Sequence, residues 1–213
     1  MTRPTLFDYY RSSASYRVRI ALNLKRVDYD SVSINLAEGA QKDADYRARN
    51  PQGFVPMLEI DGQRIGQSLA IIDYLDARFP EPALVPREAG DRAHVLSLAL
   101  IVACDIHPLN NLRVLKYLGG PLGREQAARG EWYRHWVREG LAAIEAAAAP
   151  RAGRFLFGDA PSLADICLVP QLFNARRFDT PLDDYPTLVR VDAEANRLEA
   201  FAAADPDRVA PPA

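Results

Sequence analysis

The sequence predicts an α+β fold in which a mixed α/β part is followed by an all-helical part. Up to Phe79, short β-type runs alternate with helix patterns in the order strand, helix, strand, helix, strand, strand, helix. Pro80, Pro82 and Pro86 then interrupt regular structure. Beyond these prolines almost every periodic segment has helical spacing. The chain therefore consists of two parts with different secondary structure.

Composition limits the classes of function. With 213 residues, 48% of them hydrophobic, the chain is long enough to bury a substantial core. Its 26 basic and 28 acidic residues give no sign of a nucleic-acid footprint or a polybasic membrane patch. Residues 1–25 lack an apolar signal core, and the longest apolar run, around 95–104, is far too short to span a bilayer. We predict a soluble cytoplasmic protein with no nucleic-acid or membrane partner.

Two cysteines, Cys104 and Cys167, lie among apolar neighbours. Cysteines in such surroundings are usually buried, reduced thiols. Two are too few for a disulfide framework or a cysteine-based zinc site. We therefore predict no metal centre.

The chain is organised around a serine cluster that follows the first strand, predicted over residues 4–10. The cluster leads into a helix pattern that should end near Lys25. The N-terminus of a helix exposes unpaired N–H groups and favours an anion. The hydroxyls of Ser12, Ser13 and Ser15 add hydrogen-bond donors, and Arg11 adds a guanidinium. These groups strengthen the preference for an anion. Two interpretations remain open: an anion site, or a simple N-cap made by Ser12 or Ser13.

Further elements follow from alternation, turn residues and helical spacing. The first part contains a strand over 29–34, a polar loop or short helix over 38–49 and a turn at 50–53. Strands over 54–60 and 63–66 follow, and then a helix over 69–79 capped by Gln67-Ser68.

The second part contains helices over 93–117, 125–149 and 186–201, the first of them kinked at Pro108. A further helix begins with a capping box at 162–165. The tryptophans Trp132 and Trp136 should pack in the core, and the tail over 205–213 should be loose.

Four segments together resemble the zeta-class glutathione transferases, over almost the whole chain. They are Ser12–Leu22, the pairs Asn50-Pro51 and Val55-Pro56, the run Gln67–Ile72, and the run Asp105–Asn111. The resemblance implies the glutathione transferase fold: a thioredoxin-like glutathione-binding domain over 1–82 and an all-helical substrate-binding domain over 88–213. It also implies glutathione as cofactor and a homodimer.

The resemblance assigns the cofactor contacts. Ser13 would donate a hydrogen bond to the glutathione sulfur, with Ser12 beside it. Pro56 would follow a cis peptide bond, which leaves the backbone of Val55 to pair with the cysteinyl part of the tripeptide. At the start of their helix, where an anion is favoured, Gln67 and Ser68 would hold the γ-glutamyl carboxylate. The remaining contacts would come from Ser15, Arg17, Gln41, His107, Asn111, Leu112 and Arg113.

The implied activity is the glutathione-dependent cis–trans isomerisation of maleylacetoacetate in aromatic amino-acid catabolism. Maleylpyruvate isomerisation, and transferase or dehalogenase chemistry on small electrophilic acids, are alternatives. Arginines bind carboxylates and stabilise developing charge, so Arg11, Arg113 and Arg177 join Ser12 and Ser13 as predicted catalytic residues. A non-catalytic relative should have lost the serines or Gln67-Ser68, and both are present.

Some readings stay open at single positions. Taken alone, each arginine is typical of a solvated surface residue. His107 suits a proton relay, a glutathione contact or a structural role. Ala14 stands where many family members have cysteine. A thiol at that position is therefore not expected to be essential for the isomerisation.

Overall fold

A computed structural model describes residues 3–211, whose contacts divide the chain into two compact units. The first comprises 3–83 together with 197–211, and the second is Leu84–Asn196. The predicted helical domain included 197–211, whereas in the structure this segment packs within the first unit. The domain limits of 1–82 and 88–213 otherwise stay a prediction.

The first unit contains a four-stranded sheet with the order β2-β1-β3-β4. Its strands are β1 (Thr5–Asp8), β2 (Asp30–Ser33), β3 (Met57–Ile60) and β4 (Gln63–Gly66). Strand β2 runs parallel to β1, while β3 runs antiparallel to both β1 and β4. The β3–β4 turn has positive φ at Asp61 (49°) and Gly62 (76°), the conformation that matches the twist of a two-residue hairpin. The predicted α+β fold is confirmed.

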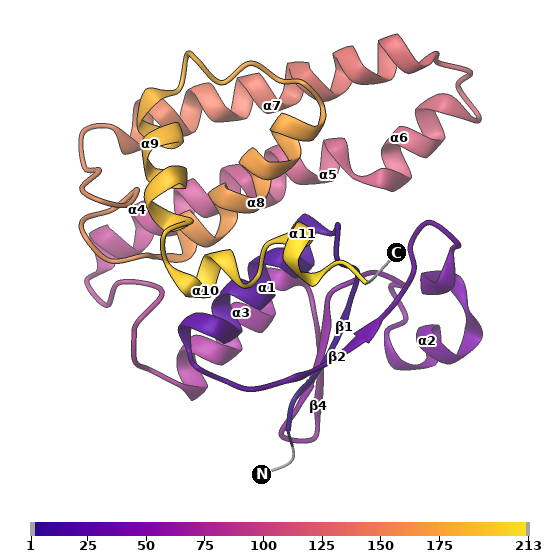
Figure 1. Cartoon of the computed structure of the whole chain (residues 1–213), viewed down its shortest axis with the longest axis horizontal. Coiled ribbons are helices and arrows are strands. Elements are labelled where there is room, and N and C mark those ends of the chain that lie inside the picture. The colour runs from indigo at the N-terminus through magenta and orange to yellow at the C-terminus, as the bar shows by residue number, and fades with distance from the viewer. Residues whose placement is uncertain (1–2, 212–213) are drawn as a thin grey trace. The chain divides into compact units, whose positions relative to one another are not determined.

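Helices cover both faces of this sheet. Helices α1 (Ser13–Leu24) and α3 (Ser68–Arg78) pack against each other (Figure 1). Their fully buried apolar side chains include Val18, Ile20, Leu22, Ile71, Ile72 and Leu75. Because successive strand residues point to opposite faces, Phe7 and Met57 form a separate cluster with Tyr46 of α2 (Ala44–Arg49). A 3₁₀ turn, Ala40–Lys42, precedes α2.

The C-terminal segment returns to α1. The predicted helix over 186–201 is wrong as a single element: α9 (Pro186–Ala195) ends at Asn196, and the chain resumes in α10 (Glu199–Ala202). Helix α10 packs on α1, where the Asn23 side chain donates to the Ala200 carbonyl at 2.9 Å (Figure 1). The predicted loose tail instead forms α11 (Pro206–Val209), capped by Asp205, and residues 212–213 lie outside the described part.

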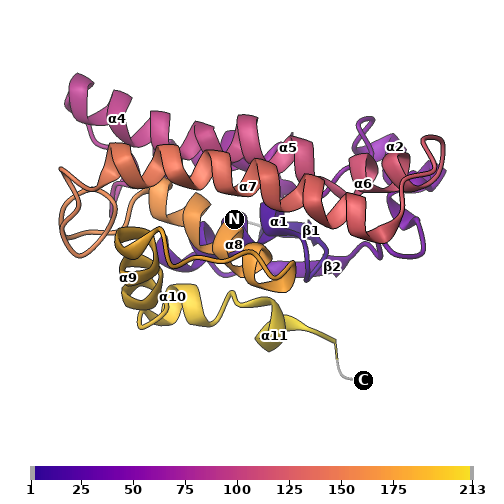
Figure 2. The same cartoon turned by 90° about the horizontal axis from the view of Figure 1, so that it is seen from above.

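The second unit is helical. Its elements are α4 (Ala89–Leu100), a π-helical segment (Ile101–Ile106), α5 (His107–Asn110), α6 (Leu112–Gly119), α7 (Gln126–Ala148), α8 (Leu163–Arg177) and α9. Helices α4, α7 and α8 run alongside one another (Figure 2). A Cβ atom at Gly140 of α7 would lie 2.3 Å from the Ile106 side chain, so only glycine permits this close approach. The predicted capping box is present, because Ser162 and Asp165 exchange both bonds.

The single helix predicted over 93–117 is wrong. The π-helical turn precedes Pro108, and Asn111 adopts an extended conformation (ψ 147°) in which its side chain caps α6 by accepting from the Arg113 N–H at 3.1 Å. An Asn side chain that bonds the nearby backbone competes with helix continuation. The π turn buries Val102 and Ile106 but leaves Cys104 exposed, contrary to the prediction, whereas Cys167 is buried.

The helical run Ala89–Gly119 is long and apolar enough to cross a membrane, judged by length and composition alone. This corrects the expectation that the apolar run around 95–104 is far too short. Core helices of soluble proteins pass the same test. The run is also interrupted at Asn111, so it is not one continuous helix.

Candidate active site

The serine loop, defined here as residues 9–12, connects β1 to α1. Ser12 is the N-cap of α1, and its hydroxyl accepts a hydrogen bond from the Ser15 N–H at 3.2 Å. The capping interpretation therefore holds for Ser12. Ser13 is the first residue of the helix and is 5% exposed. Ser15 is fully buried, and among the described residues its hydroxyl oxygen has no hydrogen-bond partner.

The start of α3 is joined to α1 through a buried arginine. Arg17, which is 2% exposed, donates from Nη1 to the Ser68 hydroxyl at 3.3 Å. The preceding residue, Gln67, has φ 65° and ψ 118°, and its side-chain Nε2 donates to the side-chain Oε1 of Gln52 at 2.7 Å. Non-glycine residues in this region of φ carry strain of about 1–3 kcal/mol and are concentrated at functional sites.

A cis peptide bond joins Val55 to Pro56, as the resemblance predicts. The turn before it brings Gly53, with φ 63°, against the 3₁₀ turn that carries Gln41. A Cβ atom at Gly53 would lie 2.8 Å from the Gln41 carbonyl oxygen, so the approach requires glycine. The Gln41 side-chain oxygen is buried and has no hydrogen-bond partner among residues 3–211.

Strand register brings these three segments to one edge of the sheet. Phe7 of β1 pairs with Met57 of β3, which in turn pairs with Gly66 of β4. The serine loop follows β1, the cis bond precedes antiparallel β3, and Gln67 follows β4, so all three leave the sheet at the same edge. The predicted glutathione residues of the first unit are thus brought together by topology.

This edge favours an anion. Two helices, α1 and α3, begin there, and neither has an acidic residue in its first turn. Each N-terminus carries roughly half a positive charge and exposes unpaired N–H groups. Arg11 is exposed within the loop, and its guanidinium carbon lies 5.0 Å from the centre of the Tyr10 ring.

The second unit places its predicted residues at helix ends. At the α5–α6 break, the Asn111 amide nitrogen lies 3.5 Å from His107 Nε2. Leu112 and Arg113 are exposed in the first turn of α6. Arg177 is exposed at the end of α8, where it donates to the Asn174 side-chain oxygen at 3.4 Å.

Tyr133 lies close to this end of α8. Its ring stacks on Phe178 with centroids 3.8 Å apart. Burial raises the pKa of Tyr133, while a hydrogen bond with Gln171 and the charge of Arg177 act in the opposite direction. Arg177 is therefore near enough to a buried phenol to influence it electrostatically.

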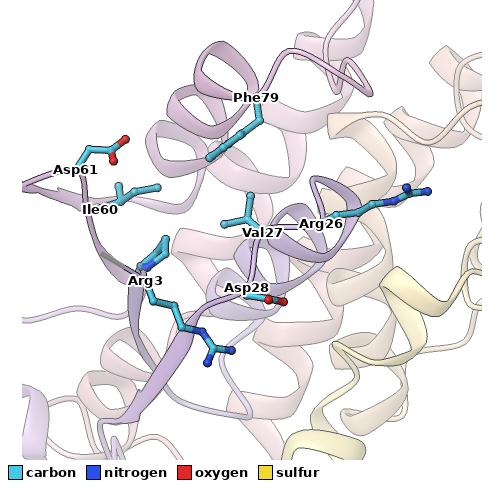
Figure 3. Close-up of a pocket in the computed structure, with 8 residues that line it drawn as sticks. Arg3, Arg26, Val27, Asp28, Ile60, Asp61 and Phe79 are labelled. Atoms are coloured by element: carbon cyan, nitrogen blue, oxygen red, sulfur yellow. The ribbon is translucent and has the colours of Figure 1, made fainter. Parts of the chain in front are cut away.

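A separate hollow of about 420 Å³ lies at the far end of α1 and α3 in the first unit (Figure 3). Ile60, Val27 and Phe79 supply apolar side chains, while the charged side chains come from Arg3, Arg26, Asp28 and Asp61 (Figure 3). None of the predicted site residues lines it. The hollow is therefore distinct from the sheet edge described above.

Comparison with protein families decides the assignment. The N-terminal domain of glutathione S-transferase matches residues 6–83, and its C-terminal domain matches residues 126–204. The chain belongs to the glutathione S-transferase family. It is 48% identical to the maleylacetoacetate isomerase of Rhizobium meliloti, a match that covers 97% of each chain.

Two solved structures are similar over nearly the whole chain. The holo structure of a zeta-class bacterial maleylpyruvate isomerase has a TM-score of 0.96 and 44% identity, covering 98% of this chain and 100% of that one. A maleylacetoacetate isomerase from Anaeromyxobacter dehalogenans 2CP-1 has a TM-score of 0.88 and 44% identity, covering 97% and 96% respectively. That structure contains glutathione bound in its active site.

Three features of the site were not predicted from the sequence. The positive φ falls on Gln67, which is not a residue that favours it. Arg17, predicted as a cofactor contact, donates a hydrogen bond to the Ser68 hydroxyl. The helix break at Asn111 was hidden within a continuous helical pattern. Two arginines inside an apolar helix, at 17 and 19, were the only available sign of a buried polar network.

Proposed function

We propose that this glutathione S-transferase is a zeta-class isomerase that converts maleylacetoacetate to fumarylacetoacetate with glutathione as cofactor. The observation that carries the proposal is the meeting of two acid-free helix N-termini and a cis-proline segment at one sheet edge. The full-length similarity to the maleylacetoacetate isomerase of Rhizobium meliloti supports the choice of substrate.

The donors of the first unit suit glutathione, which carries carboxylates and a thiol. Gln67 and Ser68 would hold the γ-glutamyl carboxylate at the start of α3, where N–H groups favour an anion. The backbone of Val55 would pair with the cysteinyl part, and Gln41 would add a further contact. Arg17 would act through Ser68, because its guanidinium donates a hydrogen bond to the Ser68 hydroxyl.

Glutathione, when bound, supplies a thiolate for reversible addition to the cis double bond, so that rotation followed by elimination gives the trans isomer. Ser13 would donate its hydroxyl proton in a hydrogen bond to the sulfur, with Ser12 and the N-terminus of α1 beside it. A free thiol has a pKa of about 8.5. Lowering it by about two units, worth about 2.7 kcal/mol, makes the thiolate dominant at neutral pH.

Arginines would bind the carboxylates of the diketo acid and stabilise the enolate that addition creates. Arg177 is one candidate, and its neighbour Arg176 is already paired with the buried carboxylate of Asp192 at 2.7 Å. Arg11 and Arg113 are further candidates, and both are exposed. Asn111 and Leu112 would contribute to the helical wall of the site, with His107 as a contact or proton relay.

Maleylpyruvate is the second candidate substrate. The observation that favours it is the TM-score of 0.96 against the zeta-class maleylpyruvate isomerase. The reacting diketo acid is common to both substrates, so the chemistry above applies to each. Only side chains that contact the remainder of the molecule would distinguish them.

The experiment is a spectrophotometric assay with maleylacetoacetate and with maleylpyruvate, each with and without glutathione. Conversion that requires glutathione is expected, and the ratio of kcat/KM values identifies the preferred substrate. Glutathione binding without conversion of either acid would overturn the isomerase proposal in favour of transferase or dehalogenase chemistry. Conversion at equal rates without glutathione would exclude the proposed cofactor role.

We also infer a cytoplasmic homodimer, which rests on the zeta-class resemblance. Light scattering is expected to give the mass of two 23.6-kDa chains. A single-chain mass at the concentration of the assay would contradict the dimer. Recovery of the protein in a membrane fraction would contradict the location.

A further inference from the structure

Arg19 lies seven residues into α1 and is 1% exposed. All three nitrogens of its guanidinium donate hydrogen bonds. Nη1 donates to both carboxylate oxygens of Asp8, at 2.9 and 2.8 Å. Nη2 donates to the Tyr10 carbonyl at 3.1 Å, and Nε to the Ala204 carbonyl at 3.0 Å. One buried group thus joins a strand, a loop and the C-terminal segment.

Two of these acceptors flank the start of the serine loop. Asp8 is the last residue of β1, and Tyr10 lies within the loop. At the other end the Ser12 N–H donates to the Tyr9 carbonyl at 2.8 Å, and Ser12 caps α1. The path from Asp8 to Ser13 is therefore set by the guanidinium at its beginning and by the helix cap at its end.

The third acceptor belongs to a segment far away in the sequence. Ala204 follows α10, which is tied to α1 by the bond from Asn23 to the Ala200 carbonyl. If Ala204 were removed, the buried Nε–H would lose its partner, which is unfavourable for a charged donor. The C-terminal segment thus completes the set of bonds that fixes Arg19.

A buried ion pair adds little to stability relative to well-packed apolar side chains, whereas it does restrict geometry. We propose that Arg19 is a positioning residue, braced by the Ala204 carbonyl, that holds the serine loop in the geometry Ser13 needs to activate glutathione. The inference rests on the proposed function for its final step. Its structural step, the fixing of the loop, does not depend on any ligand.

The test compares Arg19→Lys with Lys25→Met. Lysine keeps the charge at position 19 but lacks the fork that reaches Tyr10 and Ala204 together. Lys25 is a second buried cation at the opposite end of α1, bonded to Asp76 and to the Phe79 and Pro82 carbonyls at 2.6 Å each. Its loss should lower stability without disturbing the serine loop.

In the ligand-free protein, amide hydrogen exchange over residues 9–13 is expected to be about tenfold faster in Arg19→Lys, since one charge-assisted hydrogen bond is worth that factor. In the glutathione complex, the thiol pKa, measured from thiolate absorbance, should rise by about one unit. Lys25→Met should change neither quantity. Equal shifts in both variants, or no shift in Arg19→Lys, would overturn the inference.

Two truncated chains keep the test decisive if Arg19→Lys does not fold. A chain ending at Asp205 retains the Ala204 carbonyl, and a chain ending at Ala202 does not, while both lack α11. Faster loop exchange only in the shorter chain is expected, and identical exchange would overturn the role of Ala204. If the wild-type chain does not bind glutathione, the proposed function fails, yet the exchange result still stands.

Discussion

The two groups of candidate residues differ in how the protein holds them. In the first unit the buried polar network includes Ser68 (6% exposed) and Arg17 (2%), and Ser13 is 5% exposed, whereas Arg11 and Gln67 are exposed. In the second unit Leu112, Arg113 and Arg177 are exposed at helix ends, and α6 buries none of its residues. The three buried side chains of the first unit thus take part in the fold, whereas these three of the second unit lie on its surface.

The difference separates two kinds of mutational effect. A change in the buried network removes partners from other buried groups, so it affects stability and cofactor binding together. A change at an exposed helix end leaves packing intact, so it affects substrate use alone. The proposed division of labour fails if substitutions in the two groups give the same pattern of effects.

The largest effect on stability is expected from Lys25→Met, which tests a second buried polar network of the first unit, at the opposite end of α1. The ammonium is fully buried and bonds to three acceptors, one of them the Asp76 carboxylate. Breaking a buried pair leaves an uncompensated charge, so the free energy of unfolding should fall by about 3 kcal/mol. Denaturant unfolding measures this loss.

Arg78→Met is the matched control, because Arg78 forms an exposed pair with Asp61 at 3.2 Å. Exposed pairs contribute about 0–1 kcal/mol. A loss in Lys25→Met no greater than that in Arg78→Met would mean that burial does not strengthen this network.

Ser13→Ala should lower kcat with glutathione by about twenty-fivefold at pH 7, because the thiol pKa would return by about two units to its free value of about 8.5 and the thiolate fraction would fall by that factor. The Ser12 cap remains, so the thermal midpoint should change little. Steady-state kinetics and a thermal melt measure the two quantities. Ser31→Ala, in exposed β2, is the control, and a kcat for Ser13→Ala equal to that control would remove Ser13 from the mechanism.

A neighbouring pair of arginines tests the exposed group. Arg177→Ala should lower kcat/KM for the diketo acid by about tenfold, the value of one charge-assisted hydrogen bond, and leave stability within about 0.5 kcal/mol. Arg176→Ala should instead lower the free energy of unfolding and leave kcat/KM unchanged, because it removes a hydrogen-bond donor from the buried Asp192 carboxylate. An unchanged kcat/KM in Arg177→Ala would make Arg177 a surface charge only.

The parts of the fold that local patterns predicted are those that local chemistry determines. The Ser12 cap, the Asp61-Gly62 turn and the Ser162 capping box each depend on a few adjacent residues. The return of 197–211 to α1 was missed because it depends on tertiary contacts, and the break at Asn111 was missed although the hydrogen bond that accompanies it is local. Helical spacing alone does not reveal where a side chain will compete for the backbone.

The candidate site likewise combines features that were predicted from the sequence with features that only the folded chain reveals. The resemblance supplied the residues at the sheet edge, and the register of β1, β3 and β4 brings them together. Neither spacing nor composition indicated that Arg17 would bond Ser68 or that Arg19 would reach Ala204. Such contacts link positions 51 and 185 residues apart, so only the folded chain reveals them.

The smallest effect concerns pH and separates stability from activity. His94 of α4 lies near Phe157, with ring centroids 5.9 Å apart, and burial followed by the charge of Arg151 lowers its pKa below 6.5. As the pH falls, His94 therefore takes up its proton at a higher pH in the unfolded chain than in the folded one. The contribution of His94 to stability is full above pH 6.5 and is lost as the pH falls through that value toward the folded pKa.

Thermal melts of the wild type between pH 7.5 and 5 should show a small fall in midpoint that His94→Gln reduces. The pH dependence of kcat should be the same in both proteins, because the thiol that governs it is proposed to bind in the first unit. A shifted kcat profile in His94→Gln would contradict that separation, since it would mean that a titrating group of the helical unit acts on the chemistry.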